Sequence, residues 1–230
     1  MAIVKQRFRR RVGRSLVWLA LSSPGRAWST RRLRRLAGAQ SSVRLHLGCG
    51  PRLLPGWINI DIGIRADVTL DLRKKIPLPD ESVDYVFTED FIEHLPYASG
   101  VAVISECARL LRPGGVLRLA TPDLARFADA YTQRSDRALA WYRQEFPGLV
   151  THGQMFNTGM RAWGHQFLYD EETMRGVLEP LGFKVERVEF GRSRYEAFQG
   201  LELRDAAEGA SSMYFEATRP MPATPSGPAS

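Results

Sequence analysis

The stretch that decides the fold is Val43-Arg44-Leu45-His46-Leu47-Gly48-Cys49-Gly50, a short apolar run that ends in a two-glycine turn. A second short run, Trp57-Ile58-Asn59-Ile60, follows this turn and ends on Asp61. Glycines allow a ligand to approach the backbone closely, and a carboxylate at the tip of the next strand can accept hydrogen bonds from ribose hydroxyls. The pairing of the glycine turn with Asp61 therefore indicates a site for a cofactor that contains adenosine.

The residues after the turn narrow the choice of cofactor. A dinucleotide-binding fingerprint needs a third glycine where the helix packs beside the pyrophosphate, and that place holds Leu53. Pro51 and Pro55 leave room for at most one or two helical turns between Gly50 and Gly56. A cofactor without a pyrophosphate has less need of a helix N-terminus. The sequence therefore favours S-adenosylmethionine over NAD.

Beyond the turn, short apolar runs alternate with helical patterns, which predicts a largely parallel sheet covered by helices. The expected strands are residues 43–47, 57–61, 68–70, 83–87, 116–120, 184–190 and 213–218. The expected helices are residues 101–111, 124–146 and 171–181. Residues 147–169, rich in Gly and His, are expected to form an irregular lid over the acceptor.

The positive charge is concentrated at the beginning of the chain. The 230 residues carry a net charge of +7, but residues 1–60 hold thirteen Lys and Arg and no acidic residue. Residues 61–230 carry 19 basic and 25 acidic side chains, a net charge of −6. We therefore expect a basic leader over residues 1–40, a catalytic domain over residues 41–219, and a disordered Pro, Ala, Ser and Gly tail over residues 220–230.

The leader allows three interpretations. A secretory signal is disfavoured, because the apolar run at residues 16–21 is short and no small-x-small cleavage site follows it. A basic helix lying on an anionic membrane surface and a solvated arm whose apolar residues pack on the domain both stay open. Nucleic acid is disfavoured as a partner, because the basic residues lack interleaved aromatic side chains. The apolar residues of this arm are Leu16, Trp18, Leu19 and Leu21.

Candidate catalytic residues follow from the chemistry of an alcohol acceptor, which must lose its proton, a role that suits histidine. His94 follows the fourth expected strand and His165 lies in the irregular segment, while Asp123 stands at the tip of the fifth strand. A structural role for His94 stays open. Because no cluster of His, Cys, Asp or Glu has metal-ligand spacing, we expect a mechanism without a metal. The cysteines, Cys49 and Cys107, do not favour a disulfide and fit a reducing cytoplasm.

An ordered set of short motifs carries a resemblance to a known family. The motifs are Leu45–Gly50, Gly56–Asp61, Asp71-Leu72, Ser82-Val83-Asp84, Glu93-His94-Leu95 and Arg112–Gly115. With them the chain resembles class I S-adenosylmethionine-dependent methyltransferases of the bacterial small-molecule type, from about residue 43 to residue 218. The resemblance implies a Rossmann-like, doubly wound α/β fold. Its sheet has seven mostly parallel strands in the order 3-2-1-4-5-7-6, with the last strand antiparallel.

The resemblance also implies roles for particular residues. The glycine loop would border the methionine and ribose, Asp61 and its neighbour would hold the ribose, and Asp71-Leu72 would lie near the adenine. Glu89, at the tip of the fourth strand, would face the cationic sulfonium or the substrate. The implied cofactor-binding residues are Leu47, Gly48, Cys49, Gly50, Asp61, Ile62, Asp71, Leu72 and Glu89.

The acceptor implied by the resemblance is a small molecule or a glycan, methylated on oxygen. The protein would then work in the cytoplasm, either free or peripherally on the inner face of the membrane. Two alternatives stay open: a non-catalytic membrane-surface or partner-binding module on the same fold, and an RNA methyltransferase. The sequence does not indicate an oligomeric state.

Overall fold

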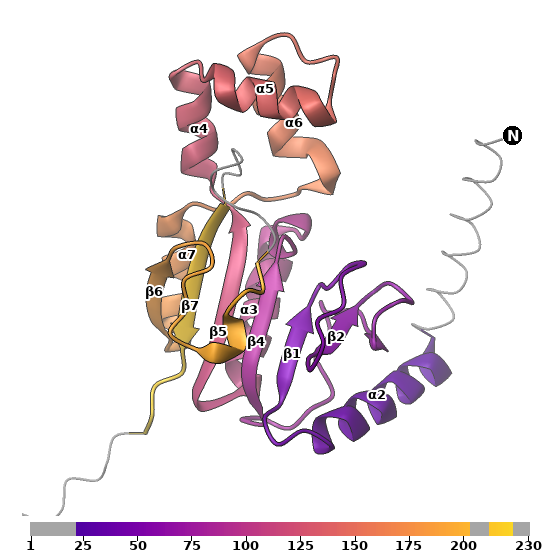
Figure 1. Cartoon of the computed structure of the whole chain (residues 1–230). Coiled ribbons are helices and arrows are strands. Elements are labelled where there is room, and N and C mark those ends of the chain that lie inside the picture. Colours follow the sequence, from indigo (N-terminus) through magenta and orange to yellow (C-terminus); the bar gives the residue numbers. More distant parts are fainter. Residues whose placement is uncertain (1–21, 203–211, 223–230) are drawn as a thin grey trace, which may run out of the picture.

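The computed structural model describes residues 22–202 and 212–222, and its centre is one seven-stranded sheet (Figure 1). The strand order is β3-β2-β1-β4-β5-β7-β6, and only β7 among these strands runs antiparallel to its neighbours. The predicted fold class and strand order are therefore confirmed. The strands are β1 (Arg44–Leu47), β2 (Ile58–Asp61), β3 (Val68–Thr69), β4 (Val83–Glu89), β5 (Leu111–Pro122), β6 (Lys184–Val188) and β7 (Ser212–Thr218).

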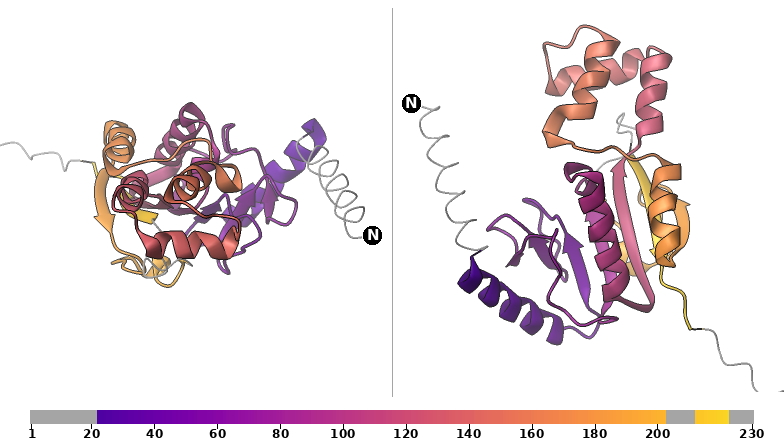
Figure 2. Two further views of the ribbon diagram at one scale, coloured as in Figure 1. Left: turned by 90° about the horizontal axis from the view of Figure 1, so that it is seen from above. Right: turned by 180° about the vertical axis from the view of Figure 1, so that it is seen from behind.

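The two faces of the sheet are covered in different ways. Helices α3 (Tyr97–Leu110) and α7 (Glu171–Leu178) lie against one face, as the view from behind shows (Figure 2). Successive strand residues point to opposite faces, so Leu117 and Leu119 of β5 join this helix-covered core while Val116 faces the other way. The second face is closed by the segment between β1 and β2 and by the 3-10 turn Glu196–Phe198.

The segment between β1 and β2 contains turns and no helix in this described stretch, as the two prolines predicted. Instead of a helix, Leu54 and Trp57 supply the apolar cover, and both are buried against Phe87 of β4 and Phe198. The segment between β1 and β2 is therefore too short for a helix but long enough to cover this face of the sheet with apolar side chains.

Two expectations about the region after β5 are wrong in detail. The expected helix over residues 124–146 divides into α4 (Leu124–Thr132) and α5 (Asp136–Glu145), because Arg134 has a φ of +47° and the Ser135 side chain caps the next helix. The expected irregular segment contains α6 (His152–Arg161), which begins with a capping box formed by Thr151 and Gln154.

Helices α4, α5 and α6 form a cap above the carboxyl ends of the parallel strands (Figure 1). The cap has its own core of four buried residues, separate from the core of the sheet. They are Phe127, Leu139, Tyr142 and Met155. Ligands of open α/β sheets bind at the carboxyl ends of the strands, so the cap lies over the edge where a site is expected.

The part of the leader that the structure describes is α2 (Ser23–Gly38), which packs against the sheet core through the fully buried Leu33. The other apolar leader residues, from Leu16 to Leu21, and the tail beyond residue 222 lie outside the described residues. Within residues 22–202 and 212–222, none of the helices combines the length and the apolar character needed to cross a bilayer.

Candidate functional site

The glycine turn after β1 is held by hydrogen bonds to the neighbouring strand. The amides of Gly48 and Cys49 donate to the carbonyl of Ile60 at 2.9 and 3.3 Å, and the amide of Gly50 donates to Oδ2 of Asp61 at 3.0 Å. Three successive amides of the turn are thus used within the protein, whereas a pyrophosphate site presents such amides to the ligand. This geometry agrees with a cofactor that lacks a pyrophosphate.

The two glycines of the turn are required for different reasons. A Cβ on Gly48 would lie 2.2 Å from Cγ of Phe91, so this glycine makes room for an aromatic ring of the protein. A Cβ on Gly50 would meet nothing within 4 Å, although its φ of +53° still favours glycine. The space at Gly50 is thus open, whereas the space at Gly48 is filled by the Phe91 ring.

Asp61 ends β2 beside the turn, as predicted. Its Oδ2 accepts the hydrogen bond from the Gly50 amide, and its Oδ1 accepts one from the Gly63 amide at 2.6 Å. A carboxylate offers about four lone-pair positions, so these two bonds orient Asp61 and leave capacity for a further donor. Asp61 is therefore both a turn-forming residue and a preorganised acceptor.

A cavity of about 300 Å³ opens beside Asp61, at the lower end of the size range for small-molecule sites. Ile62, 46% exposed, and Phe91 give it apolar walls. Among the residues expected to hold the cofactor, the ones that line the cavity are Asp61, Ile62, Asp71 and Leu72. The remaining ones, Leu47, Gly48, Cys49, Gly50 and Glu89, lie outside its described lining.

Two of the expected acidic residues are engaged in ion pairs. Asp71 is held by Arg73, whose Nε lies 2.8 Å from Oδ1, and the hydrogen bonds from Arg73 lower the pKa of the Asp71 carboxyl. Glu89 is paired with Arg52 across the glycine turn at 2.9 Å. Both carboxylates are therefore oriented by arginines, and the Glu89 pair anchors the segment that follows the turn.

Cys49 lies within the turn, and its thiol is protected. The residue is 4% exposed, and burial raises the pKa of its thiol to about 12. Cys107 in α3 is also buried, and both cysteines are free thiols. A protonated, buried thiol is a poor nucleophile, so Cys49 contributes packing to the turn.

The two candidate histidines lie side by side, and one of them lines the cavity. His94 ends the 3-10 turn Ile92–His94 after β4 and lines the cavity, and its ring centroid lies 5.1 Å from that of His165. The chain returns to this point because the amides of Gln166 and Phe167 donate to the carbonyl of Glu93 at 2.7 and 3.2 Å. The structure thus brings together two histidines that are far apart in the sequence.

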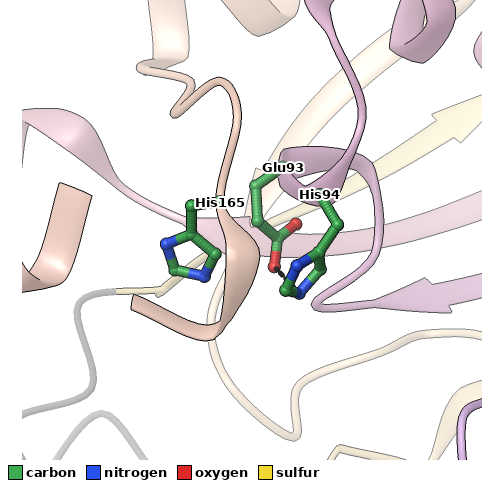
Figure 3. A group of neighbouring side chains, drawn as sticks. All are labelled: Glu93, His94 and His165. Carbon is green, nitrogen blue, oxygen red and sulfur yellow. Dashed lines mark ion pairs between the residues drawn. The ribbon is translucent and has the colours of Figure 1, made fainter. Parts of the chain in front are cut away.

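Glu93 lies between these histidines, and sequence reasoning did not single it out. Figure 3 shows its carboxylate between the two imidazole rings, and its side chain is fully buried. Its Oε1 lies 3.7 Å from Nε2 of His94, and its Oε2 accepts a hydrogen bond of 3.0 Å from the Thr121 hydroxyl. The signal was present in the Glu93-His94-Leu95 motif, but only folding reveals that the glutamate faces both rings.

Asp123, the third candidate catalytic residue, makes two structural contacts. Its Oδ1 caps α4 through the Ala125 amide at 3.0 Å, and its Oδ2 lies 2.8 Å from a guanidinium nitrogen of Arg187. It is 2% exposed and lies outside the described lining of the cavity. These two contacts fix the orientation of the Asp123 carboxylate, and its part in catalysis stays a prediction.

Comparison with known proteins gives matches to the central part of the chain. Residues 61–119 match the family model described as a methyltransferase domain. A probable S-adenosylmethionine-dependent methyltransferase of Mycolicibacterium smegmatis is 42% identical over 64 residues, which are 28% of this chain and 24% of that protein. A probable S-adenosylmethionine-dependent methyltransferase of Mycobacterium tuberculosis is 43% identical over 64 residues, which are 28% of this chain and 23% of that protein.

The chain thus spans about a quarter of the length of the curated relatives it matches. Among solved structures, an S-adenosylmethionine-dependent methyltransferase from Archaeoglobus fulgidus aligns with 84% of this chain and 94% of that chain. The identity of this pair is 18% and the TM-score is 0.48.

The strand order is the one that the resemblance implied, and the match of residues 61–119 to a methyltransferase domain supports that resemblance. The family model describes a methyltransferase domain, and both relatives are named as probable S-adenosylmethionine-dependent methyltransferases.

Proposed function

We propose that the protein transfers a methyl group from S-adenosylmethionine to a hydroxyl oxygen of a small molecule or glycan. The observation that carries this proposal is one cavity whose lining includes both Asp61 and His94. S-Adenosylmethionine, when bound, supplies a methyl group on a positively charged sulfur. The residues of the chain then have to hold the cofactor, place the acceptor and accept a proton.

The cofactor-binding part of the proposal concerns Asp61 and its neighbours. Asp61 accepts hydrogen bonds from the ribose hydroxyls through the lone pairs that the Gly50 and Gly63 amides do not use. Such hydrogen bonds to a charged carboxylate are stronger than those between neutral groups. Ile62 and Leu72 supply the apolar surfaces beside the adenine, next to the carboxylate of Asp71. The remaining residues of the glycine loop, with Glu89, support this arrangement from outside the cavity.

The acceptor part of the proposal concerns the two histidines and the cap. Methyl transfer to an alcohol needs the hydroxyl oxygen in line and its proton removed. The proposal gives this task to His94 and His165, and the 5.1 Å between their rings supports it. Trp163 is 44% exposed, its ring lies 5.6 Å from that of His165, and Phe146 supports its ring at 5.3 Å. An exposed aromatic ring beside the histidines suits the apolar face of a sugar, which supports a glycan acceptor.

Cofactor binding is the first test, measured by calorimetry with S-adenosylmethionine and S-adenosylhomocysteine. We expect Asp61→Asn to weaken binding by about 10- to 100-fold, because the charged acceptor is lost while the shape is kept. Asp136→Asn is the matched control, since the Asp136 side chain is 96% exposed in the cap. A well-folded parent protein that binds neither compound would overturn the proposal, and unchanged affinity in Asp61→Asn would overturn the ribose assignment.

Transfer is the second test, measured with cofactor labelled on the methyl group and glycan fractions from cell extracts. We expect His94→Asn and His165→Asn to bind the cofactor normally and to lose about 100-fold or more of the transfer rate. His152→Asn is the control, because His152 pairs with Asp136 in the cap, outside the described lining of the cavity. Normal cofactor binding without transfer to any glycan or small-molecule fraction would favour the non-catalytic module, and labelled RNA would favour the RNA methyltransferase.

We also propose that the enzyme works in the cytoplasm, on the inner face of the membrane, through α2. This helix carries five arginines and no acidic residue, and Trp28 is 58% exposed with the Arg32 guanidinium 5.2 Å from its ring centroid. Basic residues beside an exposed tryptophan suit an anionic lipid surface. Sedimentation with phosphatidylserine vesicles tests whether the protein binds anionic membranes. The double substitution Arg31→Glu and Arg35→Glu should abolish this binding. Equal binding to neutral phosphatidylcholine vesicles, or none to either, would contradict it.

A further inference from the structure

The cluster formed by Glu93, His94 and His165 has the composition of a metal site, although the spacing of these residues in the sequence gave no sign of one. One ligand atom from each residue lies within 4.8 Å of the other two. Two imidazoles and a carboxylate are a known ligand set for catalytic zinc, in which the fourth position stays open. We propose that Glu93, His94 and His165 bind one divalent transition-metal ion of the Zn²⁺ class.

The distances require little movement to close around an ion. A tetrahedral ion about 2.0–2.2 Å from each ligand sets the ligand atoms about 3.4 Å apart. The Oε1 of Glu93 and the Nε2 of His94 are already 3.7 Å apart. Rotation of the His165 side chain, which reaches the cluster from the other side (Figure 3), therefore supplies most of the remaining approach.

The hydrogen bonds around the cluster orient its ligands as they do in metal sites. The Nδ1 of His165 lies 3.0 Å from the carbonyl oxygen of Gly159, which can only accept. Nδ1 therefore carries the hydrogen of the neutral ring, and Nε2 carries the lone pair that a metal needs. Glu93 is held in the same way, because its Oε2 accepts the hydrogen bond from Thr121. Both ligands thus have the outer hydrogen-bond partner typical of metal centres.

The negative charge of Glu93 and the exposure of His94 both agree with a bound cation. Glu93 is fully buried, and a bound divalent ion compensates a carboxylate more completely than a neutral imidazole does. The His94 side chain is 32% exposed and lines the cavity, so an ion can enter from that side. Two nitrogen ligands and one oxygen ligand favour Zn²⁺ and its neighbours over Mg²⁺, which prefers oxygen and water.

The use of this ion in catalysis rests on the proposed function. With the ion bound, His94 and His165 act as its ligands and not as bases. A hydroxyl oxygen of the acceptor held at the open position becomes more acidic and loses its proton to solvent. The oxygen lone pair then forms the new O–C bond, the S–C bond breaks, and its electron pair stays on the sulfur. The cationic sulfur becomes a neutral thioether, so the charge is balanced by the released proton.

The experiment measures metal binding to the full chain without cofactor, after treatment with a chelator. Calorimetry with ZnCl₂ is combined with the visible absorption of Co²⁺, which reports tetrahedral coordination by nitrogen and oxygen. We expect one equivalent to bind, His165→Ala to weaken Zn²⁺ binding by at least about 100-fold, and Thr121→Val to weaken it by about 10-fold. His152→Ala should bind like the parent protein.

The outcomes separate the metal site from the transferase activity. Because Glu93 is buried and Glu93→Gln can disturb folding, the partly exposed His165 carries the decisive substitution. No Zn²⁺ binding by the parent, or equal binding in His165→Ala, would overturn the metal site. Cofactor binding is measured separately on chelator-treated protein. If the protein binds Zn²⁺ but not the cofactor, the proposed function is refuted and the metal site stands. If it binds the cofactor but not Zn²⁺, the metal site is refuted and the proposed function stands.

Discussion

His46 should make the stability of the protein depend on pH in a defined window. The residue lies on β1 and is 3% exposed, and its Nδ1 is 3.0 Å from Oδ1 of Asn59. Oδ1 of Asn59 also accepts a hydrogen bond from the Leu54 amide, so Nδ1 of His46 is the donor to this oxygen. Burial lowers the pKa of His46 from 6.5 to about 4.

The sign of the effect follows from proton binding in the two states. Below pH 6.5 the unfolded chain binds a proton at His46 that the folded protein resists down to about pH 4, so acid favours unfolding. The free energy of unfolding should therefore fall by up to about 1.4 kcal/mol per pH unit in this window. At pH 4.5 the accumulated loss from this one residue is about 2.5 kcal/mol, and above pH 7.5 there is none.

Urea unfolding of the parent and of His46→Gln at several pH values isolates this contribution. Glutamine can donate the same hydrogen bond to Asn59 and does not titrate, and the carboxylates common to both proteins cancel in the difference. We expect the stability of the parent relative to His46→Gln to drop by about 2.5 kcal/mol between pH 7.5 and pH 4.5. A difference that changes by less than about 0.5 kcal/mol would refute the assignment of a neutral, desolvated His46.

Two further predictions concern the buried ion network and the cap. Arg118 is fully buried and pairs with Glu202 and with Glu216. Arg118→Met should lower the free energy of unfolding by about 3–5 kcal/mol, because it leaves two buried carboxylates uncompensated. A loss below about 1 kcal/mol in urea unfolding would contradict this. A Cβ on Gly159 would lie 2.1 Å from the Phe127 ring, so Gly159→Ala should cost about 1–3 kcal/mol and speed hydrogen exchange in α4–α6. In Gly153→Ala, on the same helix with 3.9 Å of clearance, exchange should stay slow, and equal effects of the two would refute the packing argument.

The sheet could be predicted because the residues that start and end its strands are neighbours in the sequence. The central strands β1, β2 and β5 are apolar runs that end next to Gly48, at Asp61 and at Pro122. The helix after Asp170 likewise carries its cap and its terminating Gly182 in sequence. The cap was predicted less well. The helical pattern runs unbroken through Arg134, and only the backbone turn there divides it, so composition alone does not separate α4 from α5.

The same distinction holds at the site. The pairing of Asp61 with the glycine turn was predictable, because neighbouring parallel strands bring these residues to the same edge. The contact between Glu93 and His165 was not, because it depends on the chain leaving β5, forming three helices and returning to bind the backbone of Glu93. The need for glycine at residue 48 was likewise assigned to a ligand, since the position of Phe91 follows only from the fold.

The way the cap joins the sheet has a consequence for how such enzymes diversify. The chain leaves the sheet at Asp123 and returns at Tyr169, where the two residues form a parallel bridge and the Leu124 amide donates to the Tyr169 carbonyl at 2.8 Å. Because the chain leaves and re-enters the sheet at adjacent residues, the segment between Asp123 and Tyr169 forms an insertion with its own core, called here the cassette. Under the proposed function, exchanging this cassette is expected to change the acceptor while the glycine turn and Asp61 stay intact.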